Sequence, residues 1–271
     1  MTQATAQPRR HQATLALDAR ATLGECIRWD ERQKLIYWVD IPGRQLHRYD
    51  PATGRDDAMP LAQEMGCFAL AERGGFICGM RSGYARLDRF GGDFTPLASP
   101  DYDPAKARFN DGRCDSAGRF WAGTMWEPRD RAGGIVYRLD ADGRFGAQCN
   151  PVIIANGITF APDGRSMTLA DTTNHVLWAF DYDLVTGIPS SRRELRSYEP
   201  ASGRPDGACV DAEGNVYVAI MAGGRVEKIS PTGELLAVIE LPIPNITCCT
   251  FAGDDLRTLY ITTARTRMTD A

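Results

Sequence analysis

The chain of 271 residues lacks the features of several common protein classes. Its net charge is −4, from 31 Lys and Arg against 35 Asp and Glu, so there is no basic excess of the kind that nucleic-acid-binding proteins use. No apolar run is long enough to span a membrane. The N-terminal stretch MTQATAQPRRHQ has no apolar core like that of a secretory signal. We therefore expect a cytoplasmic monomer or weak dimer that binds neither nucleic acid nor a membrane.

The motifs of several kinds of active site are also absent. The 8 Cys include no C-x-x-C pair with zinc spacing, and 3 His are too few for a histidine-rich metal site. We interpret the cysteines as reduced and mostly buried. The sequence has no G-x-S-x-G elbow and no phosphate-binding G-x-x-x-x-G-K-[ST] loop. Serine-hydrolase chemistry is therefore disfavoured.

Sustained helical periodicity is absent as well, and a repeated β pattern takes its place. A short strand, a polar turn and a second strand recur six times at a spacing of roughly 40–50 residues, the range of propeller blades. The copies begin at Cys26, Cys67, Gly112, Gly157, Gly207 and Cys248. Two further strand-like runs lie between copies, such as GIVYRLD and GRFGAQC. The pattern predicts an all-β, six-bladed β-propeller with four-stranded blades, and a β-sandwich or irregular all-β domain is the alternative.

The two ends of the chain determine how the last blade is completed. We expect residues 1–12 to form a disordered leader and residues 13–271 to form a single propeller domain. After the strand TLYITTAR only TRMTDA remains, so the last blade is short by one or two strands. An N-terminal strand often closes the last blade of a propeller, and HQATLALDA at 11–19 suits that role. We expect the last blade to be incomplete, with an edge that exposes backbone donors and acceptors.

The repeat brings polar side chains to one end of the predicted propeller. The first strand of each blade lines the central channel, so the starts of these strands meet at one mouth. The starts are Gly24-Glu25, Cys67, Asn110-Asp111, Asn156-Gly157, Asp206-Gly207 and Thr247-Cys248. Carboxylates crowded in a partly desolvated channel repel one another, and a divalent cation removes that cost. Asx-Gly pairs are also common turns, but a turn does not require equivalent positions in several repeats.

These motifs carry a family resemblance. Five of them, from about residue 20 to residue 265, follow the order and spacing of the senescence marker protein 30 (regucalcin), gluconolactonase and luciferin-regenerating family. They read TLGECIRWD, RFNDGRCDSAGRFWAGTM, NGITFAPDG, RPDGACVDAEG and LPIPNITCCTFAGDDLRTLYITTAR. The resemblance implies a six-bladed propeller with one catalytic divalent metal on its axis.

The resemblance also implies which residues form the site. The implied metal ligands are Glu25, Asn156 and Asp206. Two carboxylates and an amide favour Ca²⁺, Mg²⁺ or Mn²⁺, and they do not exclude Zn²⁺ or Fe²⁺. The implied substrate-binding residues are Arg108 and Asn110, which would hold sugar hydroxyls above the metal.

The sequence departs from the family pattern in three places. Glu127 is the nearest match to a further substrate-contacting glutamate that follows a G-T-M motif, but its offset differs by one residue. Cys26 stands where the family usually has a small residue after Gly-Glu. The family's closing Gly-Gly-aromatic strand after TTAR is absent, which bears on stability more than on the site.

We therefore predict a metal-dependent sugar lactonase that opens an aldonolactone, such as glucono-, xylono-, arabinono- or galactonolactone, to the aldonic acid. The metal acts as a Lewis acid, and Asp206 is the candidate general base. One alternative is a non-catalytic propeller with a Ca²⁺ site. Another is a lactonase or esterase for larger apolar substrates, which the scarcity of aromatic residues near the site motifs disfavours. We interpret Asp171 as a strand-end aspartate rather than a group that supports a ligand.

Overall fold

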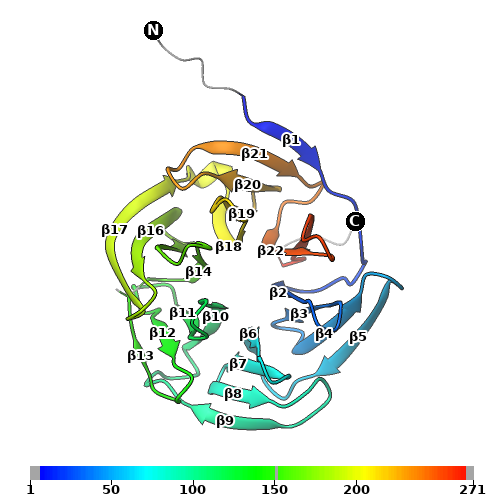
Figure 1. The fold of residues 1–271 in the computed structure, drawn as a ribbon, viewed down its shortest axis with the longest axis vertical. Helices are drawn as coiled ribbons and strands as arrows, with labels where there is room; N and C mark the ends of the chain where they lie inside the picture. The colour runs from blue at the N-terminus through cyan, green and yellow to red at the C-terminus, as the bar shows by residue number, and fades with distance from the viewer. Residues whose placement is uncertain (1–6, 150–151, 267–271) are drawn as a thin grey trace.

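The computed structural model describes residues 7–149 and 152–266, and within these ranges the chain is almost entirely β-structure. The strands form six sheets arranged around a common axis (Figure 1). One short 3₁₀ helix, η1 (Pro200–Ser202), precedes the fifth sheet. No helix among the described residues has the length and apolar character needed to cross a membrane.

The strands nearest the axis and their immediate neighbours occur in all six sheets (Figure 1). The inner strands are β2 (Gly24–Asp30), β6 (Met65–Leu70), β10 (Ala107–Cys114), β14 (Ala155–Phe160), β18 (Arg204–Val210) and β22 (Ile246–Ala252). The second strands are β3 (Leu35–Asp40), β7 (Phe76–Met80), β11 (Phe120–Trp126), β15 (Ser166–Asp171), β19 (Val216–Met221) and β23 (Thr258–Thr263).

Only the first five sheets, here called blades one to five in chain order, continue outward to third and fourth strands. The third strands are β4 (Gln45–Asp50), β8 (Gly83–Leu87), β12 (Val136–Leu139), β16 (Val176–Asp183) and β20 (Arg225–Ile229). The outer strands are β5 (Arg55–Pro60), β9 (Phe94–Ala98), β13 (Phe145–Ala147), β17 (Ile188–Ser197) and β21 (Leu235–Glu240). The prediction of an all-β propeller is confirmed. The number of four-stranded blades is corrected from six to five, because the sixth sheet contains only β22 and β23 within the described residues, in agreement with the expected incomplete last blade.

The N-terminal strand lies elsewhere than the sequence predicts. β1 (Arg9–Gln12) pairs in parallel with β21, so it extends blade five rather than closing the sixth sheet (Figure 1). The described residues provide no third strand beside β23, and an N-terminal strand therefore has no partner at the outer position there. The predicted strand at 11–19 is a strand only at residues 11–12, because residues 13–19 form none. The predicted disordered leader at 1–12 is corrected at residues 9–12, which lie in β1, and residues 1–6 lie outside the described ranges.

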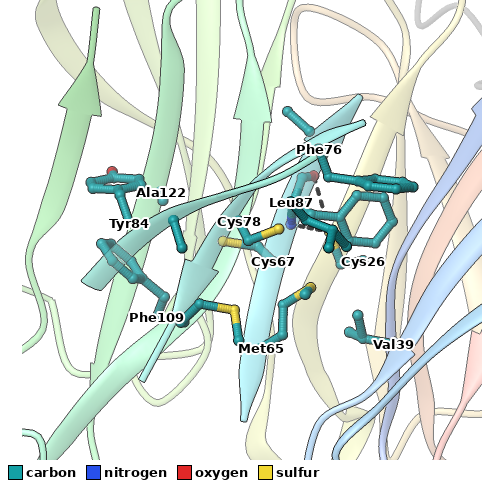
Figure 2. Packing of buried hydrophobic residues seen from close by; sticks show 14 of the residues in the cluster. Cys26, Val39, Met65, Cys67, Phe76, Cys78, Tyr84, Leu87, Phe109 and Ala122 are labelled. Carbon is teal, nitrogen blue, oxygen red and sulfur yellow. Dashed lines mark hydrogen bonds between the residues drawn. The ribbon is translucent and has the colours of Figure 1, made fainter. Parts of the chain in front are cut away.

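The core is divided among the interfaces between neighbouring blades. The largest buried cluster lies between blades one, two and three, and Figure 2 shows Cys67 and Cys78 between Cys26 on one side and Tyr84 and Phe109 on the other. The Cys26 thiol accepts from the Phe68 amide at 3.1 Å, which ties blade one to blade two. All eight cysteines are free and six are buried, as the sequence predicts.

Every inner strand has an irregularity in its register near its start. The pairing shifts between Glu25/Arg28, Met65/Cys67, Phe109/Asp111, Asn156/Thr159, Pro205/Ala208 and Ile246/Cys248. A bulge bends a strand and re-aims the side chains within it. The repeat therefore places six re-aimed positions at one mouth of the channel.

Two arginines bridge the channel beyond these bulges. Arg28 of blade one donates to the Gly112 carbonyl of blade three, and its guanidinium lies 3.9 Å from Asp111. Arg113 of blade three donates to the Ala208 carbonyl of blade five at 2.5 Å. A hollow of about 480 Å³ opens on their far side, and the ends of all six inner strands line it. The arginines thus separate this hollow from the mouth where the bulges lie.

The bridge made by Arg28 is a testable source of stability. Replacing Arg28 with Leu leaves the buried Asp111 carboxylate without its nearest cation, so we expect the free energy of unfolding to fall by about 3 kcal/mol in urea titrations. Arg165→Leu, on an exposed turn of blade four, is the matched control and is expected to change it little. A loss below about 1 kcal/mol for Arg28→Leu would contradict a structural role for the bridge.

Candidate functional site

The three predicted metal ligands lie in the bulges of blades one, four and five. Glu25, Asn156 and Asp206 are buried at the same mouth, with exposed fractions of 5%, 3% and 5%. Burial raises the pKa of Glu25 well above its usual value, and the Asp206 and Asp111 carboxylates raise it further. Burial and the Asp111 carboxylate likewise raise the pKa of Asp206. The carboxylates are therefore close enough to repel one another in a desolvated channel, as the sequence predicts.

The Asn156 side chain is held in one orientation by both of its polar atoms. Its Oδ1 accepts from Asn110 Nδ2 at 2.9 Å, and its Nδ2 donates to Thr172 Oγ1 at 2.8 Å. Thr172 Oγ1 in turn donates to the Pro205 carbonyl at 2.8 Å. This chain of hydrogen bonds runs from blade three through blade four to blade five. It fixes the orientation of the Asn156 amide in β14, the strand that packs against the Asp206 strand β18.

Gly157 allows the Asn156 bulge to form. Its φ is +55°, a left-handed conformation that residues with a Cβ seldom adopt. A Cβ there would also meet the Asp206 carbonyl at 3.1 Å, so blades four and five approach closely at this point. The Asn-Gly pair therefore forms a bulge within β14 rather than a turn between strands.

The predicted substrate-binding residues form a second group beside the first. Arg108 is buried, and its Nη1 donates to Asn110 Oδ1 and to the Phe109 carbonyl, each at 2.9 Å. Asn110 connects this arginine to Asn156, and it also donates to the Ala155 carbonyl at 3.1 Å. The structure thus brings Arg108 and Asn110 together with a predicted ligand.

Glu127 lies at the edge of this group and interacts mainly with another arginine. Its carboxylate accepts from Arg81 at 2.7 and 3.0 Å, and the Arg81 hydrogen bonds lower its pKa. Arg81 also donates to Glu64 at 2.8 Å, and Arg108 Nε lies 3.9 Å from Glu64 and 3.7 Å from Glu127. Two arginines and two glutamates therefore form one network at the mouth, in blades two and three.

Sequence reasoning missed Glu64 and Arg81. Glu64 precedes Gly66 by two residues, as Arg108 precedes Asn110, so alignment of the repeats contained the signal. The predicted start in blade two, Cys67, is one residue after the equivalent position, Gly66, so Glu64 did not align with Arg108. Gly66 is required there, since a Cβ would lie 1.9 Å from the Phe109 carbonyl.

Asp111 is a further buried carboxylate to which the sequence analysis gave no role. Its Oδ1 accepts from the Gly112 amide at 2.8 Å and its Oδ2 accepts from the Ile158 amide at 3.1 Å. Oδ2 thus joins the bulge of blade three to that of blade four, while Oδ1 accepts within blade three. Asp111 supports the site rather than facing it.

Asp171 and Thr247 are two further polar residues at the mouth. Asp171 ends β15, as predicted, and its Oδ2 accepts from Asn174 Nδ2 at 2.7 Å within its own turn. Its Oδ1 is buried without a hydrogen-bond partner among the described residues, so the structure does not assign it a purely local role. Thr247 occupies the bulge of the sixth sheet, and its hydroxyl donates to the Gly24 carbonyl at 2.5 Å. The hydroxyl thereby joins the sixth sheet to blade one next to Glu25.

The residues present fit a divalent cation. Asp206 Oδ1 is buried and has no hydrogen-bond partner among the described residues. Neither Glu25 nor Asp206 forms an ion pair with an arginine or lysine within those ranges, although burial and repulsion disfavour both charges. The described chain has no group of three His, Cys, Asp or Glu side chains arranged for a metal, so a site here depends on the Asn156 amide as its third protein ligand.

Comparison with known proteins agrees with this architecture. The family model described as "SMP-30/Gluconolactonase/LRE-like region" matches residues 23–265. A 6-deoxy-6-sulfogluconolactonase from Pseudomonas putida is 45% identical over 246 residues, which cover 90% of this chain and 84% of that protein. Regucalcin from Homo sapiens is 34% identical over 251 residues, which cover 90% of this chain and 84% of that protein.

Solved structures show the same fold. A calcium-binding regucalcin from Agrobacterium tumefaciens superposes with a TM-score of 0.91 at 27% identity, covering 98% of this chain and 90% of that one. A luciferin-regenerating enzyme superposes with a TM-score of 0.85 at 29% identity, covering 93% and 87%. The predicted class of enzyme, a lactonase-type hydrolase, is that of the Pseudomonas relative and is confirmed at this level. The chain belongs to the SMP-30/gluconolactonase/LRE-like family, as its motifs predict.

Proposed function

We propose that the protein is a metal-dependent sugar lactonase. Glu25, Asn156 and Asp206 hold the divalent cation, and Arg108 and Asn110 bind the sugar beside it. One observation carries the proposal: the buried Asp206 Oδ1 has no hydrogen-bond partner among the described residues. Neither Asp206 nor Glu25 forms an ion pair with an arginine or lysine there. Beside them, Asn110 joins Arg108 to Asn156 by hydrogen bonds. The candidate ions remain Ca²⁺, Mg²⁺, Mn²⁺, Zn²⁺ and Fe²⁺, since oxygen ligands accept each of them.

The residues divide the reaction between charge stabilisation and orientation. When bound, the cation supplies Lewis-acid stabilisation of the negative charge that develops on the lactone carbonyl oxygen. Asp206 would help to hold the cation and would take a proton from the attacking water. The Arg108 guanidinium and the Asn110 amide orient the sugar through its hydroxyls, and Glu127 lies at the edge of that surface in contact with Arg81.

Aldonolactones are the substrate class that this site fits best. Amide, carboxylate and guanidinium groups at the mouth match a polyhydroxylated ring better than an apolar ester. The 45% identity to a 6-deoxy-6-sulfogluconolactonase places a sulfonated gluconolactone among the first candidates, together with the unmodified aldonolactones. Such lactones are products of sugar oxidation at the anomeric carbon, so a sugar dehydrogenase must supply them.

Removal of metal and of its ligands tests the proposal. We expect EDTA treatment to abolish acid release from aldonolactones and single divalent ions to restore it. Asp206→Asn should lower kcat by at least about 100-fold, since it removes the proton acceptor and a ligand charge, and Glu25→Gln should weaken metal binding. Asp254→Asn, on an exposed loop, is the matched control and should retain full activity.

The same preparations distinguish catalysis from simple ion binding. We expect the metal to raise the Tm of the wild type but not that of Asp206→Asn, because the ion binds only the folded protein. A folded sample that binds Ca²⁺ and hydrolyses no lactone would contradict the enzyme and favour a calcium-binding scaffold.

Thr172 provides a test of ligand positioning. Thr172→Val keeps the shape of the side chain but removes the hydroxyl that orients Asn156 and bonds to the Pro205 carbonyl. We expect the metal dissociation constant, measured by calorimetry, to rise about 10- to 100-fold, as for other groups that hold a ligand in place. Thr172→Ser keeps the hydroxyl and should change it little. Equal affinities for the Val and Ser variants would show that Asn156 does not depend on Thr172.

A further inference from the structure

Arg204 occupies a position that the repeat marks as facing the mouth. It is the first residue of β18 and precedes the bulge residue Asp206 by two positions. At the equivalent positions of β10, Arg108 and Asn110 are joined by a 2.9 Å hydrogen bond, so the two positions lie on the same side there. The equivalent positions in the six inner segments are Leu23, Glu64, Arg108, Ile154, Arg204 and Asn245. Blades three and five therefore each present an arginine at the same level of the channel mouth.

The two arginines differ in their partners. Arg108 is buried, donates two hydrogen bonds, and lies near Glu64 and Glu127. Arg204 is half-buried, and its guanidinium forms neither a hydrogen bond nor an ion pair within the described residues. Its electrostatic neighbour is Asp206: burial and Asp111 raise the pKa of that carboxyl, and the charge of Arg204 lowers it. Arg204 thus lies at the site with its donors free.

The charges around Arg204 do not supply a counterion. With a divalent cation in place, Glu25 and Asp206 are neutralised. The carboxylates nearest the mouth have other partners: Arg28 lies beside Asp111, and Arg81 and Arg108 lie beside Glu64 and Glu127. Asp171 accepts from the Asn174 amide and forms no ion pair with Arg204 within the described residues. The half-buried Arg204 guanidinium therefore has no counterion in direct contact and is open to an anionic ligand.

We propose that Arg204 forms a subsite for an anionic group carried by the substrate, so that the preferred substrate is an acidic sugar lactone. This inference rests on the proposed function. The planar guanidinium presents paired N–H donors that match a sulfonate, a phosphate or a carboxylate in a bidentate manner. The sugar lies between its lactone group, at the cation, and its anionic group, at Arg204. Neutral aldonolactones fill the same site without this contact.

The experiment compares four lactones on wild-type protein loaded with the activating metal. They are gluconolactone and its analogues with a sulfonate, a phosphate or a carboxylate at carbon 6. Arg204→Gln removes the positive charge, and Arg204→Lys keeps the charge but lacks the paired N–H donors of the guanidinium. Arg44→Gln is the control, because it removes an exposed charge from a turn at the same end of blade one. Comparison of the three anionic lactones shows whether the subsite prefers a sulfonate, a phosphate or a carboxylate.

We expect the wild type to have a higher kcat/KM for at least one anionic lactone than for gluconolactone. Arg204→Gln should lower kcat/KM for that lactone about 10- to 100-fold, mainly through KM, and should change the value for gluconolactone less than about 3-fold. Arg204→Lys should recover part of the loss, and Arg44→Gln should change neither lactone. Added salt should reduce the advantage of the anionic lactone.

Two results would overturn the proposal. One is equal kcat/KM of the wild type for neutral and anionic lactones, and the other is an equal loss for both in Arg204→Gln. Failure to hydrolyse any lactone would instead contradict the proposed function. In that case calorimetric titration with the open-chain sulfonated acid decides the subsite, and equal affinity of wild type and Arg204→Gln would overturn it.

Discussion

The bulge near the start of each inner strand is the constraint on which the site depends. It interrupts the alternation of a buried strand, and in blades one, four and five it contains the polar side chains of Glu25, Asn156 and Asp206. Desolvated carboxylates gathered in this way repel one another, so the folded chain must offset that cost. Beneath the mouth it does so with Arg28 against Asp111, and at the mouth it leaves Asp206 Oδ1 unpartnered. The site therefore follows from a repeated backbone irregularity whose residues differ from blade to blade.

The propeller fold and the position of the candidate site could be predicted from the sequence, because six copies of the strand-turn-strand pattern recur at a regular spacing. The spacing of turns and strands predicted a propeller, and the strand starts placed Glu25, Asn156 and Asp206 at one mouth. What the sequence did not give was the local partner of each group. Whether Asp111 faces the metal or holds the backbone depends on a 3.1 Å contact with the Ile158 amide, which no pattern encodes. The position of the N-terminal strand was also predicted wrongly, since strand-like runs do not show which sheet edge such a strand will join.

The blades have diverged in a way that divides their roles. Blades one, four and five supply the proposed ligands, while blades two and three supply the neutral network of Glu64, Arg81, Arg108 and Glu127. Blade two has Gly66 in its bulge because the Phe109 backbone leaves no room for a side chain. An asymmetric mouth of this kind can orient a sugar, which a symmetric ring of carboxylates does not.

The most direct test of the account is the position of a divalent ion in a crystal of the protein grown with Mn²⁺. Anomalous scattering locates the ion without reference to activity. The account predicts a single peak on the axis, within ligand distance of Glu25, Asn156 and Asp206 oxygens. A peak at another place, such as the hollow beyond Arg28 and Arg113, with none at these three residues, would contradict it.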